Sequence, residues 1–101
     1  MIKVIIERRI MPGLEDEHEK AAREAMRSSL GARGFLNGEI LVERGRSDRR
    51  MVIVECQTLD AWNEWHTSEA RRYAMQRILP LLTEDETIRI YEPRYEKTAM
   101  R

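Results

Sequence analysis

The chain has 101 residues, of which 42% are hydrophobic and 36% charged, and its 18 basic residues balance its 18 acidic ones. This length suits one domain with a modest core, and the zero net charge gives no general attraction to nucleic acid or anionic membranes. The single cysteine, Cys56, excludes an internal disulfide bond. The opening segment MIKVIIERRIM has charges within its apolar run, unlike a signal peptide or membrane span, so we expect a cytoplasmic protein.

The first third of the chain predicts a strand followed by a helix. Residues 3–10 (KVIIERRI) are rich in β-branched side chains, which favour a strand. A Met-Pro-Gly step then interrupts the strand and precedes the helix. Across residues 14–30 the apolar side chains recur at helical spacing, and His18 lies on the apolar side. Gly31 and Gly34 are placed to end this helix.

The middle of the chain predicts a hairpin and a second helix. Residues 37–45 and 51–56 are typical of strands, and the polar residues 46–49 (RSDR) predict the turn between them. Thr58 can then cap a helix, because its hydroxyl can accept a hydrogen bond from a backbone N–H group of the first turn. This helix carries the segment DAWNEWHTSEARRYA, which contains both tryptophans.

The last part of the chain completes a recognisable order of elements. Thr67 and Ser68 interrupt the second helix, a further helical segment follows, and residues 87–93 predict the last strand. The order β-α-β-β-α-β is typical of a ferredoxin-like α+β fold, in which the helices cover one face of an antiparallel sheet. We therefore expect one domain over residues 1–93 and a polar C-terminal tail over residues 94–101.

Apolar side chains occupy both faces of the predicted sheet. Because side chains alternate between faces, Val4 and Ile6 lie opposite Ile5, and Val52 likewise lies opposite Ile53. Two helices cover one face, so the other needs a second cover, most simply the same sheet of another copy. We therefore predict a homodimer. By parity, that interface also carries charges suited to pairing, at Glu7, Arg9, Glu39, Glu43, Glu55 and Arg89.

Four segments together resemble the antibiotic biosynthesis monooxygenase family, a set of small dimeric α+β barrels. In MIKVIIERRIMPGLEDE, a strand runs through Pro-Gly into an acidic helix start. GARGFLNGEIL is similar to the family's Gly-aromatic-small-Gly-Glu passage into the second strand. VIVECQTLDAWNEWHTSEA leads from a strand to a Leu-x-x-Trp-x-x-Trp helix. PLLTEDETIRIYEP completes the match, which covers roughly residues 1–93.

The resemblance implies a ferredoxin-like monomer, a homodimer, and a pocket between sheet and helices. Family members include cofactor-independent oxygenases of phenols and quinols, heme-degrading enzymes and an isomerase. The heme-degrading branch resembles this chain at Trp65, but it also needs an asparagine late in the first strand and a histidine after the tryptophan. Arg8 and Met75 occupy those positions, so we do not expect heme degradation. Cys56 stands where the family often has another tryptophan.

Three candidate site residues share one stripe of the second helix, at a spacing of three and four residues: Trp62, Trp65 and His66. Each tryptophan is either core packing or a pocket wall, and the family position of Trp65 favours the wall. His66 is either a general base for a phenolic substrate or a histidine at the edge of the helix. Its ordinary pKa near neutrality suits proton abstraction.

Three further candidates also keep two interpretations each. His18 is either an interior histidine with satisfied hydrogen bonds or a pocket residue. Tyr73 either packs at the seam between helix and sheet or donates a hydrogen bond to a substrate oxygen. Arg8 points toward the helices by parity with Val4 and Ile6. There it either holds a phenolate or carboxylate, or it pairs with a glutamate of a helix.

Other chemistries lack their sequence signatures. His18, His66 and Cys56 show no spacing typical of metal ligands, and Cys56 follows an apolar strand, as inert thiols do. The chain has no glycine-rich phosphate loop, and its strands lack the aromatic residues of RNA-binding modules. We therefore expect no metal, no tightly bound cofactor, and neither nucleic acid nor a membrane as partner.

The resemblance and these residues favour a cofactor-independent monooxygenase acting on a small phenolic or quinol-type substrate. In this hypothesis His66 is the base, Arg8 holds the anion, Trp65 forms a wall and Tyr73 donates a hydrogen bond. Two alternatives stay open, because no complete catalytic constellation is visible in the sequence. One is a non-catalytic dimeric module that binds a small molecule, and the other is an isomerase on the same fold.

Overall fold

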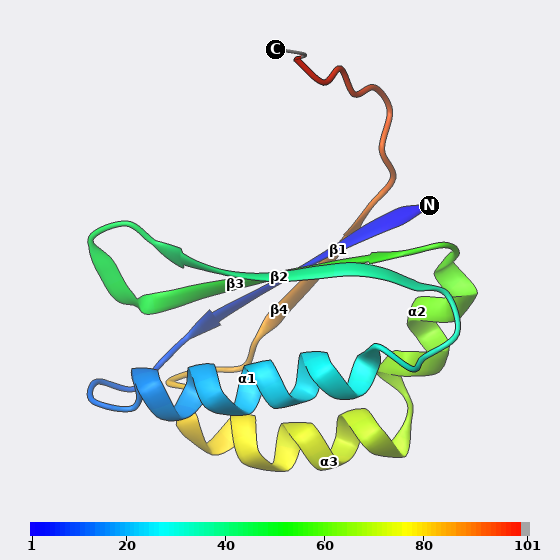
Figure 1. Ribbon diagram of the computed structural model, residues 1–101. Coiled ribbons are helices and arrows are strands. Elements are labelled where there is room, and N and C mark those ends of the chain that lie inside the picture. Colours follow the sequence, from blue (N-terminus) through cyan, green and yellow to red (C-terminus); the bar gives the residue numbers. More distant parts are fainter. Residues whose placement is uncertain (100–101) are drawn as a thin grey trace.

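A computed structural model describes residues 1–99, and its elements follow the predicted order (Figure 1). One four-stranded antiparallel sheet has the order β2-β3-β1-β4, and the helices cover one of its faces. The predicted ferredoxin-like α+β fold is confirmed. The strands are β1 (Ile2–Arg9), β2 (Phe35–Glu43), β3 (Arg46–Cys56) and β4 (Thr87–Tyr91), and the helices are α1 (Glu15–Ser29), α2 (Leu59–His66), α3 (Glu69–Ile78) and the short 3-10 helix η1 (Leu79–Leu81).

Side-chain caps explain where α2 and α3 begin. The Thr58 hydroxyl accepts a hydrogen bond from the backbone N–H of Ala61 at 3.1 Å, and the Ser68 hydroxyl accepts one from that of Arg71 at 3.2 Å. Thr67 lies between the two helices. The predicted interruption at Thr67 and Ser68 is therefore confirmed, and it gives α3 a direction of its own (Figure 1).

The hairpin turn lies earlier in the chain than the sequence predicts. The predicted turn at residues 46–49 is wrong, because these residues belong to β3 and the turn falls at Arg44 and Gly45. Gly45 has a φ of +81°, a left-handed conformation that glycine adopts without strain. The polar residues after it stay in the sheet, where Arg49 pairs with Arg9 of β1.

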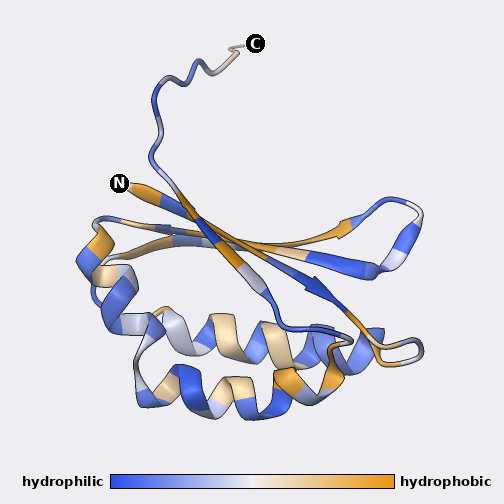
Figure 2. Ribbon diagram, turned by 180° about the vertical axis from the view of Figure 1, so that it is seen from behind, coloured by the Kyte–Doolittle hydropathy of each residue, from blue (hydrophilic) through white to orange (hydrophobic). Residues whose placement is uncertain are grey.

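The hydrophobic core lies between the sheet and the helices and has two parts. The larger part packs Val4 and Val54 of the sheet against Trp62 of α2. The smaller part, at the other end of β1, joins Ile10 to Ile78 of α3. Hydrophobic segments accordingly recur along the strands and alternate with hydrophilic ones along the helices (Figure 2).

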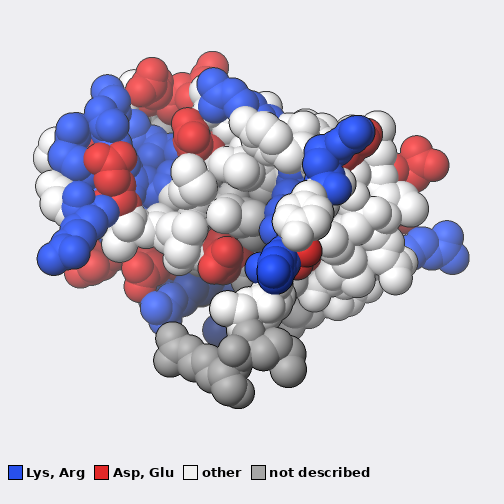
Figure 3. Space-filling model, turned by 90° about the horizontal axis from the view of Figure 1, so that it is seen from above, with Lys and Arg blue, Asp and Glu red and all other residues white. Residues whose placement is uncertain are grey.

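The outer face of the sheet, away from the helices, carries apolar residues between charged ones. Ile5 of β1 and Ile53 of β3 are directly opposite each other and half-buried within this one chain. Glu7 pairs with Arg89 of β4 at 3.5 Å. Figure 3 looks onto this face and shows uncharged side chains over its middle, with charged groups around them. Apolar residues thus lie on both faces, as the alternation predicts.

Residues 92–99 follow β4 without helix or strand and run away from the domain on the side of the outer face (Figure 1). The last two residues of the predicted tail, 100 and 101, lie outside the described residues. Within residues 1–99, no helix has the length and apolar composition needed to cross a membrane.

Candidate functional site

A buried ion-pair network lies under the helices at one end of the sheet. Glu86, in the loop before β4, accepts a hydrogen bond at each of its carboxylate oxygens. Arg8 Nε of β1 donates to Oε2 at 2.8 Å, and a terminal nitrogen of Arg71 in α3 donates to Oε1 at 2.5 Å. The three side chains are 6%, 12% and 9% exposed for Arg8, Arg71 and Glu86. The network therefore ties β1, α3 and the β4 loop together in a largely dry environment.

Burial and charge act against each other in this network. Burial alone would raise the pKa of Glu86, but the charges of Arg8 and Arg71 and the hydrogen bonds that they donate hold it below its usual range. Burial lowers the pKa of Arg8, and the Glu86 carboxylate opposes that shift. All three groups are charged at neutral pH. One carboxylate thus faces two guanidinium groups, and the network carries a net positive charge.

His18 of α1 is fully buried beside this network. Its Nε2 lies 3.3 Å from a terminal nitrogen of Arg8, and a guanidinium can only donate, so Nε2 is the acceptor and Nδ1 carries the proton. Burial lowers its pKa to about 4, helped by the charges of Arg8 and Arg50. Nδ1 has no hydrogen-bond partner among the described residues. His18 is therefore neutral at pH 7, and its Nε2 accepts a hydrogen bond that helps to position Arg8.

A small cavity of about 50 Å³ lies between the sheet, α1 and the α2–α3 pair. Trp65, which is half-buried, lines it together with Arg8, Arg71 and Met75. A hollow of this volume holds about two water molecules and is smaller than a phenol ring. The cavity is mostly apolar, with the two arginines as its charged wall.

A shallow groove of about 330 Å³ adjoins the cavity on the outside of α3. His66 and Ser68 line it at the break between α2 and α3, and Arg71 and Met75 line both the groove and the cavity. These two side chains therefore form the partition between the two hollows.

His66 lines the outer groove at the C-terminal end of α2. Its ring stacks on Trp62 with centroids 5.3 Å apart and an angle of 23° between the planes. Partial burial lowers the pKa of His66, and the charge of Arg71 adds to the effect. The imidazole is therefore neutral at pH 7 and able to accept a proton. Trp62 itself is 2% exposed and is part of the core, where it also lines the inner cavity.

The structure thus brings together Arg8, His18, Trp65 and the groove residue His66, but it leaves Tyr73 apart. The Tyr73 ring is 70% exposed on the solvent side of α3 and lies outside both hollows. The partner of Arg8 is a loop glutamate rather than a glutamate of a helix. Sequence reasoning missed Glu86 because it is 78 residues from Arg8 and lies in no periodic element.

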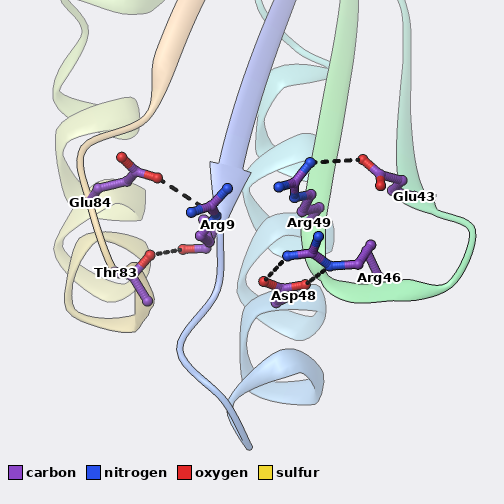
Figure 4. Close-up of polar contacts among 7 residues, drawn as sticks. All are labelled: Arg9, Glu43, Arg46, Asp48, Arg49, Thr83 and Glu84. Carbon is purple, nitrogen blue, oxygen red and sulfur yellow. Dashed lines mark hydrogen bonds and ion pairs between the residues drawn. The ribbon is translucent and has the colours of Figure 1, made fainter.

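A larger hollow of about 520 Å³ lies at the hairpin end of the outer face, on the opposite side of the sheet from Trp65. Arg9 and Arg49 are cross-strand neighbours there. Figure 4 shows each with a carboxylate at its side, Glu84 at 3.7 Å from Arg9 and Glu43 at 3.5 Å from Arg49. These ion pairs are exposed to solvent, whereas those of Arg8 and Arg71 are buried, so this hollow is a weaker candidate for catalysis than the inner one.

The described part of the chain has no candidate metal site, because no group of three histidine, cysteine, aspartate or glutamate side chains in it could hold a metal ion. Cys56 is buried, and burial raises the pKa of its thiol. Its protonated sulfur is thus a packing group.

Comparison with known proteins fits this geometry. The sequence profile of the family described as antibiotic biosynthesis monooxygenase matches residues 1–77. The chain belongs to the antibiotic biosynthesis monooxygenase family. The matched segment contains β1, α1, the hairpin, α2 and all but the last residue of α3, and it ends before Glu86. Among curated proteins, none matches this chain.

Several solved structures share the fold. The chain is similar to an antibiotic biosynthesis monooxygenase, with a TM-score of 0.85, 19% identity, and 94% of this chain and 100% of the other covered. It is also similar to a variant of SnoaB, a cofactor-independent oxygenase from Streptomyces nogalater, with a TM-score of 0.86, 15% identity and 94% of each chain covered. A conserved protein from Methanosarcina mazei gives a TM-score of 0.86 at 14% identity, with 92% of each covered.

Proposed function

We propose that the protein is a cofactor-independent oxygenase of a small phenol or quinol. The observation that carries the proposal is the pairing of two hollows across one arginine. A mostly apolar cavity under Trp65 adjoins a groove that holds the neutral His66, and Arg71 lines both. The family to which the chain belongs, and the cofactor-independent oxygenase to which its fold is similar, support this choice.

The proposed reaction needs a base, an anion holder and a dry pocket. His66 takes the phenolic proton, and Arg71, with Arg8 behind it, stabilises the phenolate. The electron-rich ring then gives its electrons to O₂ directly. A phenol and one O₂ yield a quinone and one water, so one oxygen atom enters the product and the substrate supplies both electrons. Trp65 keeps bulk water from the ring.

The small volume of the cavity favours a second candidate. With about 50 Å³ behind Trp65, the ring is accommodated only when Arg71 and Met75 move aside. A module that binds a small molecule in the outer groove, without converting it to a product, would need no such movement. An isomerase on the same fold would use the base and the cavity but not O₂.

We also propose that the protein is a homodimer that buries the outer face of the sheet. Ile5 and Ile53 are half-buried in the single chain, and Leu41 and Tyr91 are 40% and 49% exposed on the same face. Apolar residues in such an arrangement favour a sheet-to-sheet contact by two-fold symmetry. The hollow beside Arg9 then lies at the edge of the interface rather than at a separate site.

Oxygen consumption with a panel of phenols and hydroquinones, in the presence of a metal chelator, tests the proposed function. The account predicts uptake above that of heat-denatured protein for at least one compound, with one quinone formed per O₂. Product without oxygen uptake would support the isomerase. Binding of a panel member without product would support the non-catalytic module.

A further inference from the structure

Arg71 is held at the partition between groove and cavity by a single carboxylate. Glu86 Oε1 is its acceptor at 2.5 Å, while the other oxygen of the same carboxylate serves Arg8. Arg71 lies in the first turn of α3, three residues after the Ser68 cap, and its backbone N–H donates to the Ser68 hydroxyl. Because this holds the backbone in place, only the side chain is free to move. The position of the partition therefore depends on the Arg71–Glu86 pair.

Displacing Arg71 carries a different cost for neutral and for anionic ligands. A neutral ring that enters the cavity breaks the pair and leaves a desolvated guanidinium without a counter-charge. A ligand with a negative oxygen replaces the carboxylate as the acceptor of Arg71, so the charge stays balanced. Glu86 keeps Arg8 as its partner in both cases. The network thus discriminates between ligands by charge.

We propose that Arg71 makes the inner cavity selective for anionic aromatic ligands, and that Glu86 is a positioning residue that competes with the ligand for Arg71. This inference rests on the site of the proposed function but not on its oxygen chemistry. The substrate class that follows is a phenolate or an aromatic carboxylate, as opposed to a neutral aromatic ether of the same shape.

Calorimetric titration under argon tests the inference with two probes of nearly equal shape. At about pH 8, 4-nitrophenol is ionised, whereas 4-nitroanisole carries no charge. The wild-type chain is expected to bind the phenolate roughly tenfold more tightly than the ether, or better. Glu86→Gln removes the carboxylate that holds Arg71, so it should tighten phenolate binding by about tenfold. Ether binding should tighten as well, because entry of the neutral ring no longer breaks an ion pair.

Two arginine substitutions decide the result even if Glu86→Gln does not fold. Arg71→Gln leaves the Arg8–Glu86 pair intact and should bring the two affinities to within about twofold of each other. The matched control is Arg77→Gln, which also removes one paired arginine from α3, since Arg77 pairs with Glu24 of α1. It should keep the wild-type preference.

Several outcomes would overturn the inference. These are a wild-type chain that binds both probes equally or neither probe, a folded Glu86→Gln variant with weaker or unchanged phenolate binding, and an equal loss of preference in Arg71→Gln and Arg77→Gln. Because the titrations exclude oxygen, they do not depend on turnover. A chain that selects the phenolate but consumes no O₂ would support the inference and refute the oxygenase.

Discussion

His18 is buried between two arginines, and this position makes the stability of the protein depend on pH. Its pKa in the folded chain is about 4, below the ordinary value of 6.5. As the pH falls below 6.5, the unfolded chain takes up this proton and the folded chain does not, so stability is lost down to about pH 4. The protein should lose about 2 kcal/mol of unfolding free energy between pH 7 and pH 5.

Urea unfolding at a series of pH values measures this loss. His18→Leu is the matched variant, because leucine has a similar size and cannot take up a proton. The variant should lose much less unfolding free energy between pH 7 and pH 5, and the lowered pKa of His66 accounts for the remaining loss. The nearby acid, Glu86, has a lowered pKa and adds its own loss only at lower pH, as the pH falls through its folded value. An unchanged slope in His18→Leu would show that another group is responsible.

The residues of the site differ in how far the sequence reveals them. The alternation of β1 is enough to place Arg8 under the helices, and the helical period is enough to place Trp62 and Trp65 inward. Glu86 cannot be found in this way, because a loop has no period and its partner lies in the first strand. Tyr73 was expected at the seam, but α3 turns it to solvent, where it is 70% exposed.

Among the elements, the junction between α1 and β2 depends on one glycine. Gly34 has a φ of +80°, and a Cβ added there would lie 2.6 Å from the Cβ of Ala61 at the start of α2. Gly45 in the hairpin has nearly the same φ of +81°, but open space around it. A substitution at Gly34 would therefore meet both backbone strain and a close approach, whereas one at Gly45 would meet the strain alone.

Alanine at each glycine separates the two effects. We expect Gly45→Ala to lower the free energy of unfolding by about 1 kcal/mol and Gly34→Ala by about 3 kcal/mol, since the second variant also pushes α2 from the sheet. Chemical denaturation measures both. Equal losses in the two variants would mean that α2 yields freely at Ala61.

The hairpin turn and the break between α2 and α3 show why element boundaries are only partly predictable. The polar run at residues 46–49 has the composition of a turn, yet those residues lie in β3. Cross-strand pairing decides the matter: Arg49 is opposite Arg9, and Arg46 is opposite Glu43. Such tertiary pairing overrides local composition. By contrast, the break at Thr67 and Ser68 is a local capping signal, and the sequence is enough to place it.

For the molecule as a whole, the outer face of the sheet sets the expected assembly. Ile53→Lys places a charge at the centre of that face, and two-fold symmetry doubles its effect. Light scattering should give the mass of a dimer for the wild-type chain and of a monomer for this variant. Leu59→Lys, at an exposed apolar position on α2, should remain dimeric. A wild-type monomer that is insensitive to concentration would contradict the assembly.

The account of the whole protein depends most on the base at the mouth of the groove. The direct test is kcat/KM for oxygen uptake with the best quinol of the panel, measured for the wild-type chain and His66→Ala. Tyr73→Phe, outside both hollows, is the control. The account predicts that His66→Ala loses about a hundredfold or more, while Tyr73→Phe stays within about twofold. Equal activity in the wild-type chain and His66→Ala would contradict it.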